Sequence, residues 1–537
     1  MPRRSPLGAV SALASGGLLL SGCAVVDNLE RFSDDEQEQQ QEEQEQAPEP
    51  EFPYVKQGRT FLDTGNDVLR EYGIERLEST DEYMVLDAYM TILEPLSGSN
   101  TSLSAPPRLV DPESGLVYER IYNEEMERSY GSYFEEDDSK FPIHEGSPRK
   151  IRRYFPPVPE DVDTLTFTGK GMGAMSGIPV DHVDEITELP EPNAHEYINS
   201  FNWNTDDVPE GADVHYPHDE PPADHGVEPL SLEQFVDSEV ASTTRDGNEE
   251  TIALNADVMF EFDESELTDE AEEVVQQAAE SIKANLASDV EEITIVGHTD
   301  GKGGDDYNQT LSEERAETVE ELLADDLGSE FTLTTEGRGS EEPVAEEGGS
   351  DDEEARAQNR RVEFSYEIND SGGESEDAGD VGLDAAQRHV AAPAEFNEDD
   401  GEVHESVTKE DVRLDVYPLT RDGAYLIGTV VFRNTTEDPV EPELGGADAK
   451  IPGGPDQYSE GTLGGFVLSE PDSDVVRHVA QVKVGEEEYE GFAEEVHELQ
   501  PGEDYRTIAI FSAPPQDVSE MTLHAGEFGE IEGVPIR

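Results

Sequence analysis

One short stretch of this chain, GHTDGKGGDDYNQTLSEERA at residues 297–316, holds an acidic and a basic side chain that could bind a ligand together. Asp300 follows a Gly-His-Thr turn, and Arg315 lies fifteen positions later. A carboxylate attracts a cation, and the planar guanidinium fork of arginine can bind a carboxylate through two parallel hydrogen bonds. Taken singly, Asp300 has an ordinary interpretation as a turn residue and Arg315 as a surface ion pair. The surrounding elements decide whether the two residues can act together.

The patterns around this stretch predict strands and helices in alternation. Apolar residues alternate over 251–262, which is typical of a half-buried strand. The predicted elements are a strand over 251–262, a helix from Thr268 to Leu286, a strand through Ile293 that ends at Gly297, a helix capped by Ser312, a strand from Phe331, a short helix before Asn359 and a strand over 362–366. Such alternation favours crossover connections and a mixed, partly parallel sheet.

Four segments in this region share a family pattern. FEFDESEL, GHTDGKGGDDYNQTLSEERA, GRGSEEP and AQNRRVEF follow one another between residues 260 and 364. Together they resemble the OmpA-like C-terminal domain, which outer-membrane proteins, peptidoglycan-associated lipoproteins and flagellar stator proteins share. The resemblance implies that the domain binds peptidoglycan non-covalently, through the diaminopimelate of the peptide stem, and performs no chemistry on it.

The resemblance also implies a role for five residues. Asp300 matches the family's aspartate, which receives the ligand ammonium, and Arg315 matches the arginine that grips the ligand carboxylate. Thr299 and Asn308 are expected to be supporting polar groups, although Asn308 has the alternative interpretation of stabilising only the loop. Arg360, within the Asn-Arg-Arg segment, is a weaker candidate. A glycine-rich loop that folds back over the helix N-terminus would place Asp300 and Arg315 beside one small ligand.

The sequence predicts no metal site and no cofactor. His298 has no partnered His or Cys at ligand spacing, so we interpret it as structural. The segment HYPHDEPPADH, residues 215–225, offers three histidines and several acids, which is one possible metal-binding pattern. Its proline-rich, acidic composition favours a linker instead.

Acidic residues dominate the composition. The chain has 129 Asp plus Glu against 34 Lys plus Arg, a formal net charge of −95, and lysine supplies only 9 of those 34 bases. Such a field repels phosphates, so nucleic acid is excluded as a partner. The composition indicates a protein of high-salt surroundings, where the Debye length falls to about 3 Å at 1 M salt and self-repulsion is screened. An ordinary acidic secreted protein is the alternative.

The only cysteine, Cys23, follows a secretory signal pattern. Arg3 and Arg4 precede an apolar run over 7–20, and the run ends in Leu-Ser-Gly-Cys. This segment resembles the lipobox of bacterial lipoproteins, which implies cleavage before Cys23 and attachment of lipid to it. An ordinary signal peptide with a chance cysteine is the alternative. The expected location is the cell envelope, at the outer membrane if the cell has one and otherwise at the outer face of the plasma membrane.

Sequence similarity between two distant segments indicates that one module occurs twice. Residues 155–180 match residues 511–536 at an offset of 356, and 109–117 match 468–476 at an offset of 359. Both copies show β patterning, which predicts immunoglobulin-like β-sandwiches. The predicted fold is therefore multidomain, with an α+β OmpA-like domain, a βαβαβ mixed sheet, between two such modules. The predicted segments are a signal peptide 1–22, an acidic Gln-rich tether 23–52, β module 53–190, an acidic linker 191–235, the OmpA-like domain 236–370, an acidic linker 371–403 and β module 404–537.

These features predict a membrane-anchored envelope lipoprotein that tethers the membrane to peptidoglycan and is not an enzyme. The alternative is an envelope accessory or signalling protein whose β modules bind a protein partner, with the OmpA-like domain serving only to position it. A wall hydrolase would need a paired Glu/Asp or a metal site in the β modules, and the sequence offers neither.

Overall fold

The structure is a computed structural model that describes residues 52–537, with gaps. The gaps are 63–65, 95–106, 124–127, 134–145, 170, 195–210, 239, 248, 261–264, 286–291, 329–330, 346, 349–351, 369–388, 445–461, 472, 485–488 and 492–495. The predicted signal peptide, Cys23 and residues 23–51 of the predicted tether lie outside the described residues, as do residues 371–388 of the second predicted linker.

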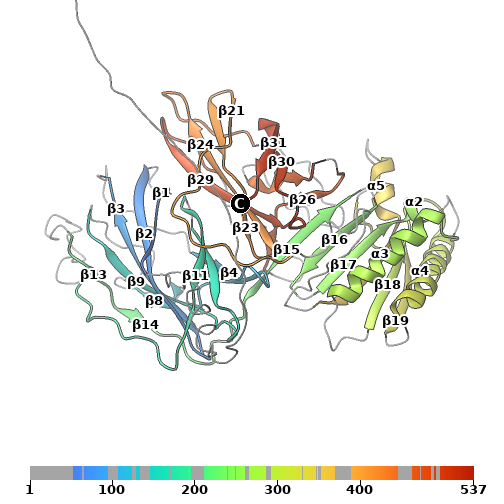
Figure 1. The fold of residues 1–537 in the computed structure, drawn as a ribbon, viewed down its shortest axis with the longest axis horizontal. Coiled ribbons are helices and arrows are strands. Elements are labelled where there is room, and N and C mark those ends of the chain that lie inside the picture. The colour runs from blue at the N-terminus through green and yellow to red at the C-terminus, as the bar shows by residue number, and fades with distance from the viewer. Residues whose placement is uncertain are drawn as a thin grey trace, which may run out of the picture. The chain divides into compact units, whose positions relative to one another are not determined.

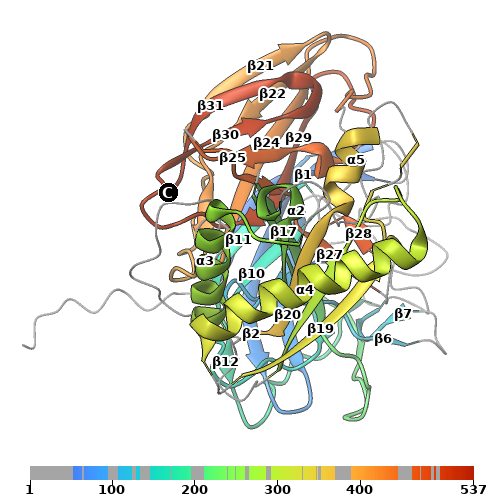
Figure 2. The same ribbon diagram turned by 90° about the vertical axis from the view of Figure 1, so that its right-hand side faces the viewer.

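A mixed sheet backed by two helices contains the stretch with Asp300 and Arg315. Its elements are β16 (Ala241–Asp246), β17 (Glu249–Asn255), α2 (Ala256–Met259), α3 (Asp269–Asn285), β18 (Glu292–His298), α4 (Asp305–Leu327), β19 (Thr332–Gly339), α5 (Asp352–Asn359) and β20 (Arg361–Glu367). The strand order is β16-β17-β20-β18-β19, and β18 and β19 run parallel. The apolar sides of α3 and α4 pack on the alternating inward residues of the sheet, and both helices are seen in Figure 2. The predicted mixed α+β sheet is confirmed.

Two predicted element boundaries in this sheet are wrong. The strand predicted over 251–262 ends at Asn255, because the Asn255 side chain accepts the Asp257 backbone N–H and opens the short helix α2. The helix predicted to begin after Ser312 begins at Asp305. The negative charges of Asp305 and Asp306 interact favourably with the positive N-terminal end of the helix dipole. The hydroxyl of Ser312 instead accepts the backbone N–H of Gly339, so Ser312 joins α4 to β19.

The N-terminal β module consists of two packed sheets. Its strands are β1 (Tyr54–Leu62), β2 (Asn66–Ser79), β3 (Met84–Ile92), β4 (Arg108–Val110), β5 (Leu116–Tyr118), β6 (Tyr122–Asn123), β7 (Arg128–Ser129), β8 (Gly131–Ser132), β9 (Arg149–Phe155), β10 (Thr164–Gly169), β11 (Gly173–Pro179) and β12 (Asp181–His182). One sheet contains β1-β2-β3-β9 and the other β11-β10-β4-β5. Buried residues of both sheets form one core, which includes Leu86 and Phe167.

The C-terminal β module repeats this strand order. Its strands are β21 (Glu405–Lys409), β22 (Val412–Val416), β23 (Thr420–Asp422), β24 (Tyr425–Asn434), β25 (Val467–Ser469), β26 (Val476–His478), β27 (Gln481–Lys483), β28 (Tyr489–Gly491), β29 (Asp504–Ser512), β30 (Glu520–His524) and β31 (Glu530–Pro535). The pairings β21-β22-β24-β29 and β31-β30-β25-β26 correspond to β1-β2-β3-β9 and β11-β10-β4-β5. The immunoglobulin-like assignment of the two modules stays a prediction.

The first predicted linker, 191–235, is wrong in its second half, because three segments after residue 213 pair with strands of the sheets. β13 (Val214–His215) pairs with β9, and β14 (His218–Asp219) pairs with β8. β15 (Leu230–Asp237) joins strands of both β modules to the mixed sheet, since it pairs with β5, with β26 and β27, and with β16. Figure 1 shows β15 beside β16. Leu232, Phe235 and Val236 of β15 are buried. The boundary predicted at residue 236 therefore falls inside a strand.

The described part of the second predicted linker, 389–403, is attached to the β modules at several points. The backbone N–H of Ala394 donates to Asp422, and Asp400 forms a buried ion pair with Lys56. Composition suggested a linker because acidic residues are usually solvated. The other acidic residues of this segment are exposed, but Asp400 is the partner of a buried donor. Among the described residues, no helix is long and apolar enough to cross a membrane.

Candidate functional site

Asp300 lies at the carboxyl end of β18, in a loop that three neighbouring groups hold in place. The Asn308 amide donates to the Asp300 carbonyl at 3.2 Å, and the Thr299 hydroxyl donates to the same carbonyl at 3.2 Å. The Asp300 carboxylate accepts the backbone N–H of Lys302 at 2.9 Å. Asn308 belongs to the first turn of α4 and not to the loop, so both supporting residues act on the backbone that carries Asp300.

Glycine is required where this loop and its strand approach α4. A Cβ on Gly297 would lie 2.1 Å from the Ser312 carbonyl oxygen, which is closer than any real contact, so only glycine lets β18 pack this near the helix. Gly303 has a φ of 106°, a backbone conformation that residues other than glycine rarely adopt. The loop geometry that presents Asp300 therefore depends on these two glycines.

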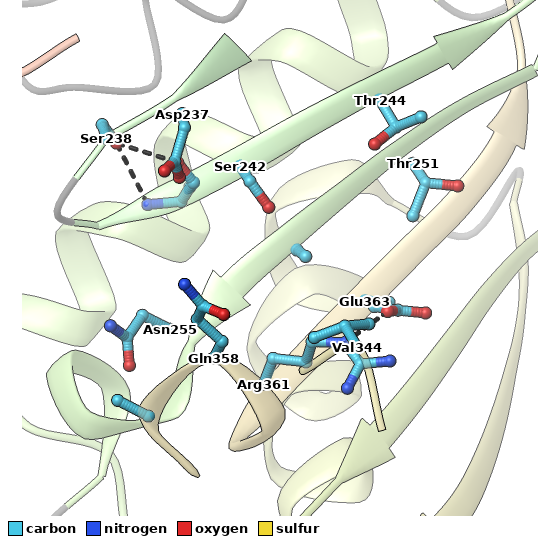
Figure 3. A pocket seen from close by; sticks show the side chains of 13 residues that line it. Asp237, Ser238, Ser242, Thr244, Thr251, Asn255, Val344, Gln358, Arg361 and Glu363 are labelled. Atoms are coloured by element: carbon cyan, nitrogen blue, oxygen red, sulfur yellow. Dashed lines mark hydrogen bonds and ion pairs between the residues drawn. The ribbon is translucent and has the colours of Figure 1, made fainter. Parts of the chain in front are cut away.

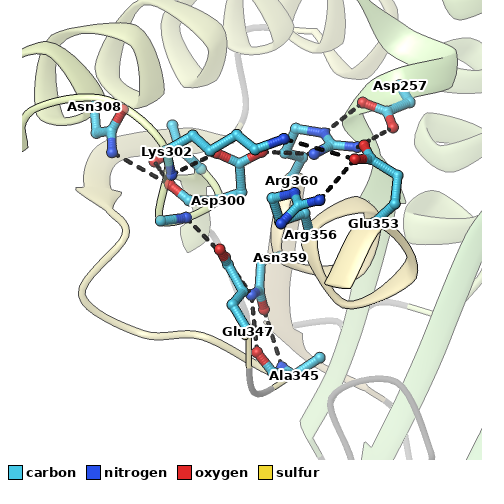
Figure 4. A network of polar contacts seen from close by, with 12 residues as sticks. Asp257, Asp300, Lys302, Asn308, Ala345, Glu347, Glu353, Arg356, Asn359 and Arg360 are labelled. Atoms are coloured by element: carbon cyan, nitrogen blue, oxygen red, sulfur yellow. Dashed lines mark hydrogen bonds and ion pairs between the residues drawn. The ribbon is translucent and has the colours of Figure 1, made fainter. Parts of the chain in front are cut away.

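Arg360 is the direct partner of the Asp300 carboxylate. Arg360 Nη1 donates to Asp300 Oδ2 at 2.6 Å. Its Nε and Nη2 donate to the two carboxylate oxygens of Asp257 in α2, at 2.7 and 2.6 Å (Figure 4). These hydrogen bonds, of which those to Asp257 contribute most, raise the pKa of Arg360 in spite of its burial. The sequence indicated Arg360 only as a weaker candidate for ligand binding; in the structure it follows the end of α5, where Asp257 and Asp300 converge on its guanidinium.

Arg315 is buried and does not lie on the surface. Only 4% of the residue is exposed, and its guanidinium carbon lies 4.9 Å from the centre of the Phe260 ring, a cation–π contact. Phe260 ends α2, the same short helix whose Asp257 holds Arg360. Arg315 also lies two turns after Asn308 and therefore on the same side of α4. Hydrogen bonds link Thr299, Asp300, Asn308 and Arg360, and α2 connects this group to Arg315.

A second loop is attached to the site through Asn359, which is fully buried. The Asn359 side chain accepts the backbone N–H groups of Val344 and Ala345 and donates to Glu347 at 3.0 Å. Glu347 in turn accepts the backbone N–H of Gly301 at 2.7 Å. The Asn-Arg pair at the end of α5 thus fixes the Asp300 loop from two directions (Figure 4).

His298 contacts an acidic residue of the neighbouring strand. Its Nε2 lies 3.4 Å from Glu363 Oε2, and Arg361 Nε donates to Glu363 Oε1 at 2.5 Å. Burial alone would raise the pKa of Glu363, but His298 and Arg361 outweigh burial and lower this pKa to about 2. No group of His, Cys, Asp and Glu suited to a metal ion occurs among the described residues.

This arrangement predicts a pH dependence of stability. Because the folded-state pKa of Glu363 is lowered from 4.5 to about 2, its stabilising contribution is present above pH 4.5 and is lost as the pH falls through that interval. The shift corresponds to about 3 kcal/mol. Glu363→Gln is expected to lower the free energy of unfolding by that order at pH 7, measured by chemical denaturation. The difference from the unsubstituted chain should narrow between pH 5 and pH 3, and a constant difference would contradict this account.

Two contributors to the site were not found from the sequence. Asp257 and Phe260 were placed on a continuous strand, because the alternation of apolar residues continues through them. The signal that could have placed them is Asn255, a residue favoured at helix N-caps, with Asp257 two positions on.

Comparison with known proteins places this site within a shared domain. Residues 259–360 match the OmpA family. Outer membrane protein A of Bordetella avium is 38% identical over 21% of this chain, and the peptidoglycan-associated lipoprotein of Legionella pneumophila is 38% identical over 20%. The matches span 55% and 58% of those two proteins. The structure of the peptidoglycan-associated lipoprotein from Burkholderia pseudomallei is 30% identical and matches 20% of this chain and 86% of that one, with a TM-score of 0.17.

Proposed function

We propose that this chain, whose residues 259–360 form an OmpA family domain, is a cell-envelope protein that binds peptidoglycan through that domain. The supporting observation is the arrangement of Asp300, whose carboxylate is fixed by a loop, with Arg315 buried on the adjacent helix. The family match and two relatives named for peptidoglycan association or the outer membrane agree with this location.

The proposed ligand is the free end of a diaminopimelate stem peptide, which carries an ammonium and a carboxylate on one carbon. The Asp300 carboxylate would accept hydrogen bonds from the ammonium, since its oxygens have lone pairs beyond those that Lys302 and Arg360 use. The Arg315 fork would bind the carboxylate. Asp257 and Asp300 already neutralise Arg360, so its role is to position Asp300 and not to grip the ligand.

The test is co-sedimentation of the full-length chain, in mild detergent, with isolated cell walls. The chain is expected to pellet with walls that carry diaminopimelate. Walls that carry lysine at the same stem position lack the carboxylate beside the side-chain ammonium, so the chain should stay in solution with them. The comparison should be run at low and at multimolar salt, because the acidic chain repels an acidic wall less when the repulsion is screened. Equal binding to both walls, or none to either at any salt, would overturn the proposed ligand.

We further propose that lipid on Cys23 anchors the chain to the membrane, so that the molecule tethers membrane to wall. The supporting observation is the lone cysteine at the end of a signal pattern. In a host that processes lipoproteins, Cys23→Ser is expected to move the chain from the detergent phase to the aqueous phase on phase separation. If the substituted chain partitions like the original, lipid on this cysteine is not the anchor.

A further inference from the structure

The face of the mixed sheet turned away from α3 and α4 is polar. Along β17, Ile252 and Leu254 point into the core that these helices cover, so Thr251, Ala253 and Asn255 point to the other face. The same alternation in β18 and β20 directs Thr294 and Ser365 to this face, where both are partly exposed. The described part of this sheet therefore presents hydroxyl groups on a face that its two long helices do not cover.

The strand register aligns these hydroxyls into one row. Thr244 is opposite Thr251, Thr251 is opposite Ser365, Ser365 is opposite Thr294, and Thr294 is opposite Thr334. Neighbouring strands lie about 4.8 Å apart, so the row crosses five strands and is about 19 Å long. Only the Thr251 and Ser365 hydroxyls bond to each other, at 2.9 Å. This spacing is comparable to the length of one sugar residue along a β-linked polysaccharide.

A cavity of about 390 Å³ lies at the β16 end of this row. Thr244 and Thr251 line it together with Ser242, Asn255 and Gln358 (Figure 3). Three polar groups of the lining are available to a ligand: the hydroxyls of Ser242 and Thr244 and the side-chain amide of Gln358. Among the described residues, these three side chains form no hydrogen bond with another protein group. The volume lies within the range of about 300–1000 Å³ that is common for small-molecule sites.

Few charged groups line the cavity. Arg361 and Glu363 pair with each other, and burial raises the pKa of Asp237 to about 6, so this carboxylate stays mostly ionised at pH 7. The remaining lining offers hydroxyl and amide groups, which are both donors and acceptors. Ring hydroxyls of sugars are also donors and acceptors, so the two sets are complementary.

We propose that this cavity and the hydroxyl row form a binding site for a glycan strand. Gln358 lines the cavity and Arg360 holds Asp300, so the turn between α5 and β20 separates the glycan site from the stem-peptide site. If the ligand is the wall glycan, a point that rests on the proposed function, one domain holds both the sugar and the peptide of the same polymer. Binding of the sugar itself does not require the Asp300 site.

The experiment is a titration of the full-length chain, by calorimetry, with wall glycan strands freed of peptide by an amidase. A neutral β-1,4-glucan oligosaccharide of similar length is titrated in parallel. Saturable binding of the peptide-free strands is expected. Thr244→Val combined with Gln358→Leu should weaken it at least tenfold, since valine keeps the strand preference of threonine but removes the hydroxyl. Thr408→Val, an exposed strand position in the C-terminal module, should leave it unchanged.

The outcomes separate this inference from the peptidoglycan proposal. Tighter binding of the amino-sugar strands than of the glucan would identify the wall glycan as the ligand. Equal binding of the two would identify polysaccharides in general as the ligand class. Both outcomes support a saccharide-binding site. If neither the wall strands nor the glucan binds, the inference is overturned. It is also overturned if the Thr244→Val and Gln358→Leu double variant binds as tightly as the original chain and has the same melting temperature. Loss of stem-peptide binding with retained glycan binding would affect the proposed function alone.

Discussion

Arg315→Ala is expected to lower the affinity of the full-length chain for diaminopimelate walls by on the order of 30- to 1000-fold, or about 2–4 kcal/mol. The Arg315 guanidinium is buried over Phe260 and therefore meets a ligand carboxylate with little competing water. In the proposed binding mode, truncation removes a two-pronged, charge-assisted interaction and leaves the ligand carboxylate unpaired in the site. Arg315→Lys keeps the charge but not the fork, so an intermediate loss is expected.

The controls for this prediction come from the same domain. Asp300→Asn keeps the shape of the side chain and removes its charge, and it should cause a loss of the same order by weakening the ammonium contact. Arg338→Ala removes an arginine whose side chain is 39% exposed and pairs with Glu336 and Glu342, so binding should be unchanged. Affinity is measured by the amount of chain that pellets as the wall concentration is varied. Equal effects of Arg315→Ala and Arg338→Ala would indicate nonspecific electrostatics and would remove the assignment of Arg315.

Asp400→Ala is expected to destabilise the chain by about 3–5 kcal/mol, which would be the largest stability effect of those predicted. Lys56 Nζ donates to Asp400 Oδ1 at 2.8 Å and to the Ala174 carbonyl at 2.9 Å, with side-chain exposures of 2% and 7% for the ion pair. Burial lowers the pKa of Lys56, and Asp400 opposes that shift. Removing Asp400 leaves the buried ammonium without its anion.

The pH dependence and a double substitution identify the cause. Without Asp400 the folded-state pKa of Lys56 falls further below its unfolded value, so the unfolded state binds more protons and the loss of stability should shrink as the pH rises toward that value. Lys56→Met with Asp400→Leu removes both buried charges and should recover the part of the stability lost to the stranded ammonium, measured by denaturant unfolding. The recovery is expected to be incomplete, because the partly exposed Arg506 also pairs with Asp400 and loses that partner. A double variant as unstable as Asp400→Ala would show that packing and not the stranded charge is responsible.

The sequence located the mixed sheet because its signals are local. Alternation at Ile293 and Ile295 and the spacing of apolar residues after Thr268 report which side of a single element is buried. The stretch from Gly297 to Arg315 was correctly placed at a strand end followed by a helix, since glycine and polar residues mark the turn. The start of the helix was misplaced by about two turns, because Ser312 is a good cap residue that tertiary contacts use for another purpose.

The linker predictions show where composition is insufficient. Proline and acidic residues in 191–235 and 371–403 indicated solvated chain, yet β15 pairs on both of its edges and Asp400 is buried. Strand pairing depends on backbone groups that every residue except proline carries, so acidic side chains do not prevent it. Whether such a segment pairs depends on the edges that other parts of the chain offer to it.

By itself, the sequence determined the repeated β module, the order of elements around Asp300 and the residue types at the site, because each of these is encoded in short-range pattern and identity. Only the tertiary structure decided that Arg360 holds Asp300, that Phe260 lies under Arg315, and that five hydroxyls align across the sheet. These contacts join residues far apart in the chain. Their partners are selected by strand register and by packing, which depend on every element at once.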